Sequence, residues 1–479
     1  MDLNDLFLSC RKGDLSQIKY LVEQKDVELN TRDKWDSTPL YYACLCGHLE
    51  VVKYLLENGA RCETNTFDGE RCLYGALNTE IRNILKNYRV VTKYLMRRDS
   101  YYEFLRRCLE DGDYYDVTFV VHQETFFAHR CILSVRCEYF NDMFLSKWKN
   151  RKCIYITHPM VKSSAFRAVL QYLYTGRLET PIDQIEDCII LAKQCKILEL
   201  IEKIKEAMKK VKSFECTKPG TNVTTILIEP DIDSSDLQRD FGVLAEQTLP
   251  RDLCEWVGGD ELPFLPNLCQ SPFADMCIQV QDYHFYCHKI FFCGRSDYFK
   301  VLITGNFIET QCEETSDITV VTLHDISMEV FLRVLMYIYR NSTELTTSNV
   351  YDVLCTADMY LLPGLKRQCA SYIAQQLDRS NIFFILRIAR LFKLPRLEDQ
   401  CAEFMSKHLE EIVDVPEFNA LVKEDALEVK ERQDTDSIAI IDDIRYHITS
   451  NVQTFSEMEE ANDKLALIDN LLENLGLEG

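Results

Sequence analysis

The stretch DVTFVVHQETFFAHRCILSVRCEYF, residues 116–140, occurs a second time in the chain as DMCIQVQDYHFYCHKIFFCGRSDYF, residues 275–299. The two copies align without a gap, so that His129 corresponds to His288. Each copy opens with an Asp and an alternating apolar run, which predicts a strand buried on one face. A polar turn, a short aromatic strand and a helix-like apolar run follow. We infer that a domain of about a hundred residues is duplicated in this chain.

The match resumes further on with a shift of six residues, and it pairs Phe166, Tyr172 and Tyr174 with Phe331, Tyr337 and Tyr339. The first copy carries Phe127-Ala128-His129-Arg130 and Tyr172-Leu173-Tyr174-Thr175-Gly176, and with these motifs it resembles the BTB (POZ) family. The second copy has Cys287 in place of the Ala and Arg340-Asn341 in place of the Thr-Gly. The resemblance implies two α/β domains that bind proteins and carry no catalytic residues.

The family resemblance also implies a structural role for Asp116 and His129, and for Asp275 and His288 in the second copy. In the family these positions lie at a corner of the fold, where the His is partly buried and hydrogen-bonded. Acid–base catalysis by these pairs is the alternative, and we favour the structural role.

Residues 1–87 contain a shorter repeat, because Gly13-Asp14-Leu15 returns with a period of 34 residues as Gly47-His48-Leu49. The unit Asp36 to Ala60 resembles an ankyrin repeat. Thr38-Pro39 is expected to start its first helix and Gly47 to end it. Ankyrin hairpin tips usually bind protein, so Trp35 and Asp36 at such a tip are candidate interface residues. The alternative is that the array only supports the next domain.

The fold class predicted is mixed α and β and mostly helical: a short ankyrin solenoid, two BTB/POZ α/β domains and a BACK-like helical region. Residues 380–412 have helical periodicity and resemble the opening helices of a BACK domain, which follows BTB in many ubiquitin-ligase adaptors. The last segment has apolar residues from Met458 to Leu475 at 3-4 spacing, which fits a terminal helix docked on its own chain better than a coiled coil. The predicted parts are 1–87 ankyrin repeats, 88–107 connecting helix, 108–211 first BTB domain, 212–268 linker, 269–378 second BTB domain, 379–450 BACK-like region and 451–479 C-terminal helix.

Composition limits the classes of function. The formal net charge of −22 argues against nucleic-acid binding, which needs a basic surface. The sequence shows neither a secretory signal nor an apolar run long enough for a membrane span. The 21 cysteines are scattered inside apolar patterns, which is typical of reduced thiols in a cytoplasmic protein, with the nucleus as a second location.

An enzyme is not expected, because no nucleophile constellation and no glycine-rich phosphate loop occurs. No cofactor is expected either. His284, Cys287, His288 and Cys293 form the tightest group of metal-ligand residue types. They lack paired Cys-x2-Cys spacing, so core packing is favoured over a metal site.

The BTB resemblance suggests one specific partner, a cullin scaffold. Cullin-recruiting adaptors of this family carry an apolar-x-Glu signature in the loop after the first helices, and Phe307 and Glu309 of the second copy fit it. The first copy reads Lys147-Trp148-Lys149-Asn150 and lacks the Glu. The expected function is therefore substrate recognition for a cullin-RING ubiquitin ligase, with the substrate protein unidentified. The alternative is a signalling or transcription-related scaffold that binds no cullin.

Two BTB copies in one chain raise the question of self-association. Members of the family often dimerise, and a linker of about 60 residues holds the two copies at about millimolar effective concentration. We expect the two copies to pair within the chain, and a homodimer is the alternative.

Overall fold

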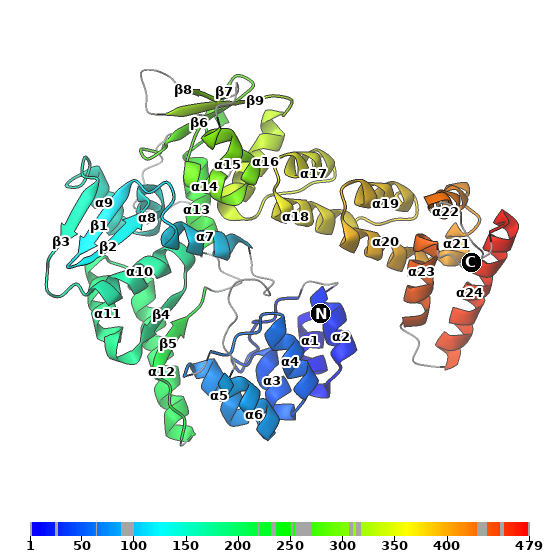
Figure 1. Cartoon of the computed structure of the whole chain (residues 1–479), viewed down its shortest axis with the longest axis horizontal. Coiled ribbons are helices and arrows are strands. Elements are labelled where there is room, and N and C mark those ends of the chain that lie inside the picture. The colour runs from blue at the N-terminus through cyan, green and yellow to red at the C-terminus, as the bar shows by residue number, and fades with distance from the viewer. Residues whose placement is uncertain are drawn as a thin grey trace. The chain divides into compact units, whose positions relative to one another are not determined.

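The computed structural model describes residues 2–23, 27–63, 65–87, 100–218, 220–230, 236–250, 252–253, 271–305, 310–312, 318–428, 438–450 and 455–477. The chain divides into two compact units, Met1–Thr343 and Glu344–Gly479 (Figure 1). The division falls inside the second predicted BTB domain.

The N-terminal part of the first unit is a stack of three helical pairs (Figure 1). Thr38 caps the second pair by accepting a hydrogen bond from the backbone N–H of Tyr41, and Pro39 occupies the first helical position. Gly47 ends that helix at φ 80°, in the left-handed region that favours glycine. Buried apolar side chains of all three pairs form one core. The helices are α1 (Asp2–Lys12), α2 (Leu15–Glu23), α3 (Pro39–Cys46), α4 (Leu49–Glu57), α5 (Phe67–Gly75) and α6 (Thr79–Asn87).

The first BTB core is a three-stranded sheet of order β2-β1-β3 packed against helices. Strand β1 runs antiparallel to β2 and parallel to β3. Phe119 on β1 is fully buried, with the rings of Phe140, Phe144, Trp148 and Phe166 at centroid distances of 5.4 to 6.4 Å. The elements are β1 (Val117–Val121), β2 (Glu124–Ala128), α8 (Arg130–Arg136), α9 (Glu138–Leu145), β3 (Cys153–Ile156), α10 (Ser163–Thr175), β4 (Leu178–Pro181), α11 (Ile185–Gln194) and α12 (Leu198–Thr217).

The second BTB core repeats this arrangement and adds one strand. Its sheet has the order β7-β6-β9-β8, in which β6 is antiparallel to β7 and parallel to β9. The extra strand β8 pairs antiparallel with the outer edge of β9. The sequence repeat thus corresponds to a repeated topology. Within the first unit the elements are β6 (Met276–Val280), β7 (Tyr283–Cys287), α14 (Lys289–Arg295), α15 (Asp297–Thr304), β8 (Thr310–Cys312), β9 (Thr319–Leu323) and α16 (Met328–Arg340).

Segments predicted as connectors contain ordered elements. Helix α7 (Ser100–Glu110) precedes the first BTB core, and residues 88–99 of the predicted connecting helix lie outside the described residues. Within the predicted linker, β5 (Thr225–Ile228) pairs antiparallel with β4 of the first BTB core, and helix α13 (Asp236–Glu246) follows. The predicted linker therefore belongs in part to the folded body of the first unit.

The second unit begins with two similar helical hairpins. A sequence similar to that from Asn349 begins at Asn381, 32 residues later. Each hairpin turn contains one residue with a φ of 52°, Leu361 in the first and Lys393 in the second. Each turn is closed by the same backbone hydrogen bond, from Leu362 N–H to the carbonyl of Ala357 in the first hairpin. The helices are α17 (Val350–Met359), α18 (Pro363–Ala374), α19 (Ile382–Leu391), α20 (Pro395–Lys407), α21 (Leu409–Ile412), α22 (Pro416–Glu428), α23 (Ala439–Ser450) and α24 (Phe455–Leu475).

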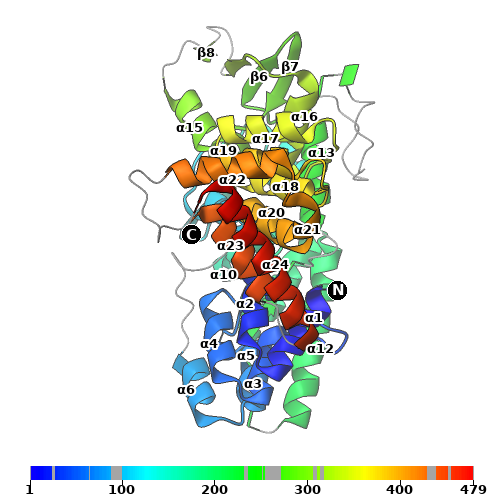
Figure 2. The same cartoon turned by 90° about the vertical axis from the view of Figure 1, so that its right-hand side faces the viewer.

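The last helix docks on its own chain. Helix α24 lies alongside α23 in both views (Figures 1 and 2) and also contacts α21. Its residues Ile468, Leu471 and Leu472 are buried there. Across the described helices, none is both long and apolar enough to span a bilayer.

Candidate protein-interaction surfaces

Asp116 and His129 hold the corner between the first sheet and helix α8, with Asp116 at the surface and His129 in the interior. The Asp116 carboxylate accepts a hydrogen bond from the backbone N–H of Arg130 at 2.8 Å. His129 is buried, with Nδ1 2.9 Å from the Tyr174 hydroxyl and Nε2 2.7 Å from the Asp113 carbonyl oxygen. Burial lowers the pKa of His129 to about 4, and desolvation by the surrounding protein raises the pKa of the surface carboxyl of Asp116 to about 6. Both ring nitrogens are therefore engaged within the chain.

Asp275 and His288 repeat this corner in the second copy. The Asp275 carboxylate accepts a hydrogen bond from the backbone N–H of Lys289 at 2.7 Å. His288 Nδ1 lies 2.8 Å from the Tyr339 hydroxyl, and its Nε2 lies 2.9 Å from the hydroxyl of Ser271, where the first copy uses a backbone carbonyl. Burial lowers the pKa of His288 to about 3 and raises that of Asp275. The two copies share the corner geometry, and its His–Tyr pair is buried in both.

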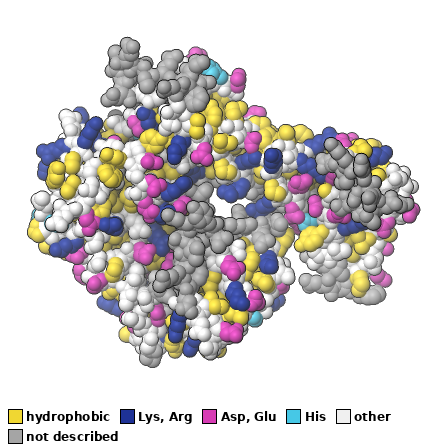
Figure 3. All heavy atoms as spheres, viewed as in Figure 1, with side chains coloured by type: hydrophobic (Ala, Val, Ile, Leu, Met, Phe, Trp, Pro, Cys, Tyr) yellow, Lys and Arg dark blue, Asp and Glu magenta, His cyan; other side chains and the backbone are white. Residues whose placement is uncertain are grey.

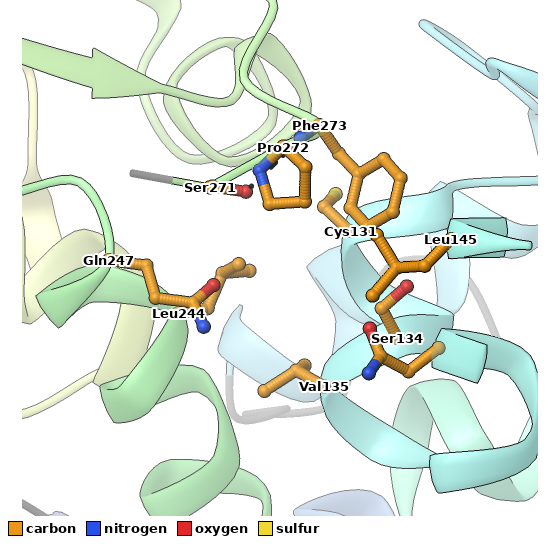
Figure 4. A pocket seen from close by; sticks show the side chains of 10 residues that line it. Cys131, Ser134, Val135, Leu145, Leu244, Gln247, Ser271, Pro272 and Phe273 are labelled. Carbon is orange, nitrogen blue, oxygen red and sulfur yellow. Dashed lines mark hydrogen bonds between the residues drawn. The ribbon is translucent and has the colours of Figure 1, made fainter. Parts of the chain in front are cut away.

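A small cavity lies between α8 and α9 of the first BTB core on one side and α13 on the other (Figure 4). Its volume is about 10 Å³, room for about one water molecule. Ser134 and Val135 line it from α8, and Leu244 and Gln247 line it from α13. This cavity is too small for an organic ligand.

The group of His and Cys residues around His288 lies largely inside the second core. Cys287 is fully buried, Cys293 is nearly so, and His288 is hydrogen-bonded as described above. Throughout the described part of the chain, no three His, Cys, Asp or Glu side chains are arranged to hold a metal ion.

The loops after α9 and α15 correspond to each other in the two copies, and they differ. In the first copy, Trp148 is 7% exposed and packs against Phe119, Phe140 and Phe144. The first loop thus uses its large apolar residue to fill its own core. Phe307 and Glu309 of the second copy lie outside the described residues.

At the tip formed by Trp35 and Asp36, one side chain is largely exposed and the other is engaged in ion pairs. The Trp35 side chain is 59% exposed, with the Lys34 ammonium 4.2 Å from its ring centroid. The Asp36 carboxylate faces the chain itself, 3.4 Å from the Arg32 guanidinium and 3.2 Å from the Lys210 ammonium. Of the two predicted interface residues, Trp35 is therefore the one presented to solvent.

The ankyrin stack docks on the first BTB core along the side that carries Asp36, Asn65 and Phe67. The Asn65 carbonyl accepts a hydrogen bond from the Thr224 backbone N–H at 3.0 Å, and the Phe67 ring lies 5.4 Å from that of Phe214 on α12. Ion pairs cross the same interface: Arg61–Glu229, Arg177–Glu63 and Lys210–Asp36. One side of the array thus contacts the next domain.

The two BTB cores pair within the chain through helices α7 and α13. Helix α7 lies between α10 of the first core and α14 of the second, and α13 lies between α16 of the second core and α8 of the first. The two helices thus occupy equivalent places, because each precedes one BTB core and also packs on the first helix of the other core. Phe104 on α7 packs on Phe291 at 5.7 Å, and the Tyr101 hydroxyl donates a hydrogen bond to the Tyr339 carbonyl oxygen. The expected internal pairing is confirmed by these contacts.

Equivalent arginines stabilise the two halves of this pairing in different ways. Arg136 on α8 forms an ion pair with Asp240 on α13, and both side chains are 5% exposed. Arg295, its counterpart on α14, lies over the ring of Tyr101 at 4.7 Å and donates a hydrogen bond to the Asn341 side chain at 2.8 Å. Sequence reasoning missed α13 and Asp240, because the linker around them contains several prolines and glycines.

The second unit exposes several large apolar side chains on its first two hairpins. Met359, Leu361, Phe384 and Leu391 are each more than half exposed. Met359 and Leu391 are equivalent positions of the two hairpins, so the exposure is repeated. The helical periodicity could not reveal this exposure, because it assigns apolar positions to the core.

The comparisons with known proteins agree with this architecture. The model of the BTB/POZ domain matches residues 105–212 and 264–377, and the model of ankyrin repeats, in three copies, matches residues 3–88. The fold thus defines a protein-interaction adaptor, in which an ankyrin stack is joined to tandem BTB domains.

Two fungal proteins are similar over nearly the whole chain. "BTB/POZ domain-containing protein 3" of Schizosaccharomyces pombe is 31% identical over 99% of this chain and 90% of its own length. "Ankyrin repeat-containing protein YIL001W" of Saccharomyces cerevisiae is 26% identical over 94% of this chain and 90% of its length. A local similarity to "Kelch-like protein 40a" of Danio rerio, 30% identical, covers 28% of this chain and 19% of that protein. The chain belongs to the family of ankyrin repeat and BTB/POZ domain-containing proteins.

Proposed function

We propose that this chain is a substrate adaptor of a cullin-RING ubiquitin ligase, in which the second BTB domain binds the cullin. The observation that carries the proposal is the difference between the two equivalent loops. The first copy buries Trp148 in its own core, whereas the second copy has the apolar-x-Glu signature in Phe307 and Glu309. The signature predicts an apolar residue that enters a partner, and of the two copies only the second carries it.

Because the two BTB cores pair within one chain and only the second carries the signature, each chain would hold a single cullin site. Helices α7 and α13 already cover the surfaces through which the cores meet, so neither core needs a second chain for this contact. An adaptor of this kind supplies proximity. Holding target and ligase together removes much of the entropic barrier to transfer, and the transfer chemistry belongs to the partners.

The test is recovery of a cullin by the full-length chain in which Phe307→Ala is combined with Glu309→Lys. Removal of an apolar anchor from an interface typically costs at least about 2 kcal/mol, so recovery should fall more than about tenfold. The matched control is Lys147→Ala with Lys149→Ala in the equivalent loop of the first copy, which should leave recovery unchanged. Both variants should keep the melting temperature of the parent chain.

Undiminished recovery by the first variant would refute the assignment of this loop. If the parent chain recovers no cullin, the alternative of a scaffold that acts without a cullin is favoured. In that case the same interaction surfaces would join proteins of another pathway.

A further inference from the structure

The two BTB sheets differ at one edge. In the second sheet, β8 pairs antiparallel with β9 through Thr310↔Val321, Gln311↔Val320 and Cys312↔Thr319. The equivalent strand of the first sheet, β3, lies at the end of the order β2-β1-β3 (Figure 1). No described residue pairs with its outer side. Within the described residues, the first copy thus has an open edge where the second copy places a strand of its own.

The backbone of β3 has hydrogen-bonding groups available at this edge. The carbonyl oxygens of Lys152 and Ile156 accept hydrogen bonds from Thr118 and His122 on the β1 side. Because alternate residues of a strand face the same neighbour, the N–H and C=O groups of Cys153 and Tyr155 face outward. An open edge of this kind is a template for the addition of another strand.

The side chains at the edge are accessible as well. Tyr155 is 72% exposed and Cys153 is exposed, whereas Ile154 between them is buried in the core. The edge strand is therefore anchored from the inside and presents an aromatic ring on the outside.

The approach to this edge is basic. Lys147, Lys149, Arg151 and Lys152 are all exposed and follow one another within six positions, and none of them forms an ion pair with another described residue. This is a local exception in a chain with a formal net charge of −22, where charges of both signs are interspersed on the face shown in Figure 3. A basic approach favours an acidic ligand.

The corresponding stretch of the second copy has the opposite charge. Residues 306–317, which contain β8, carry Glu309, Glu313, Glu314 and Asp317 and neither Lys nor Arg. The strand that covers the second edge is thus embedded in an acidic segment.

We propose that the outer edge of β3 binds an extended acidic segment of a partner protein, which adds to the first BTB sheet as an antiparallel strand. The antiparallel direction follows from the pairing of β8 with β9 in the second copy. Backbone hydrogen bonds would supply most of the affinity, and the four basic side chains would select acidic sequences. A second copy of this chain fits poorly at the edge, because two basic edges repel each other. The site is independent of the cullin contact proposed above.

The probe for the test is a synthetic peptide with the sequence of residues 308–317, labelled with a fluorophore and with Cys312 replaced by Ser. Fluorescence anisotropy with the full-length chain should show saturable binding that weakens with added salt. Lys149→Glu combined with Lys152→Glu should reduce the affinity at least about fivefold. Arg167→Glu on the exposed surface of α10 is the matched control and should leave the affinity unchanged.

A second peptide separates strand addition from simple charge attraction. Methylation of alternate backbone nitrogens on the side that would face β3 keeps all side chains and charges but removes the hydrogen-bond donors. We expect at least about a tenfold loss of affinity for this peptide. Equal affinity of both peptides, or no saturable binding of the first, would overturn the proposal.

Hydrogen exchange identifies the occupant. The amides of Cys153 and Tyr155 should exchange fast in the free chain and slowly with the peptide bound. Protection in the free chain that is independent of concentration would mean that a segment of this chain already covers the edge. Protection that grows with the concentration of the chain would mean a second copy. Either result would overturn the proposal of a partner protein.

Discussion

The two BTB copies share their interior and differ on their surface. Both bury a His–Tyr pair at the same corner, both pair a long strand with the same neighbours, and both lie against the helix that precedes the other copy. They differ in the loop after the second helix of each core. The first copy buries Trp148 there, and no described strand pairs with the outer side of its β3, whereas the second copy adds the strand β8.

This difference indicates which constraints act on a duplicated domain. The corner and the paired helices are fixed, because a buried polar group or ion loses its partner if one side changes. A surface loop carries few such constraints, so the two loops were free to diverge in charge and in strand content. Divergence at these loops lets one chain offer two different docking surfaces.

The largest effect on stability is expected from the ion pair that joins the first BTB core to α13. Arg136→Ala leaves the buried Asp240 carboxylate with only the half-exposed Arg239 as its cation. Breaking a buried pair typically costs about 3–5 kcal/mol, and because Arg239 remains we expect the lower end of this range. The free energy of unfolding in urea measures this. Arg167→Ala removes an exposed pair with Glu124 and should cost less than about 1 kcal/mol. Equal costs for the two variants would contradict a buried link between the BTB copies.

The next largest effect is expected in the pH dependence of stability, which arises from the buried histidines at the two corners. The pKa of His129 is lowered to about 4 and that of His288 to about 3, so the unfolded chain binds protons near pH 5 that the folded chain does not. The two neutral histidines therefore contribute their full stabilisation of the folded chain above about pH 6.5, and this contribution is lost as the pH falls toward their lowered pKa values. The raised pKa values of Asp116 and Asp275 act in the opposite direction.

His129→Gln and His288→Gln should therefore each reduce the loss of stability between pH 7 and pH 5 by about 2 kcal/mol. Urea unfolding at the two pH values measures the loss, and the exposed His158→Gln is the control. If only one corner responds, the two copies differ in their interior as well as on their surface.

The smallest effect on stability is expected at the ankyrin tip. Trp35→Ala removes a side chain that is largely exposed, so the free energy of unfolding should change by less than about 0.5 kcal/mol. Asp36→Ala should cost more, because its carboxylate links Arg32 and Lys210. A thermal unfolding series ranks the two. If Trp35→Ala destabilises the chain as much as Asp36→Ala, the ring supports the fold and is a weaker candidate for binding a partner.

The sequence by itself determined the elements that depend on neighbouring residues. The period of 34 residues, the capping by Thr38 and Pro39 and the left-handed Gly47 set the helical pairs of the ankyrin stack. The alternating runs after Asp116 and Asp275 set the central strands, and the repeat implied that their sheets match.

Only the tertiary structure decided which surfaces remain open. The burial of Trp148, the engagement of Asp36 by Lys210 and the free edge of β3 depend on residues that are brought together by folding. The same holds for the contact of Arg136 with Asp240, which are 104 positions apart. Local periodicity records how each segment is patterned, but it contains no information on which distant segment covers it. That is why the sequence predicted the modules of this chain and the tertiary structure decided how they pair and what they leave exposed.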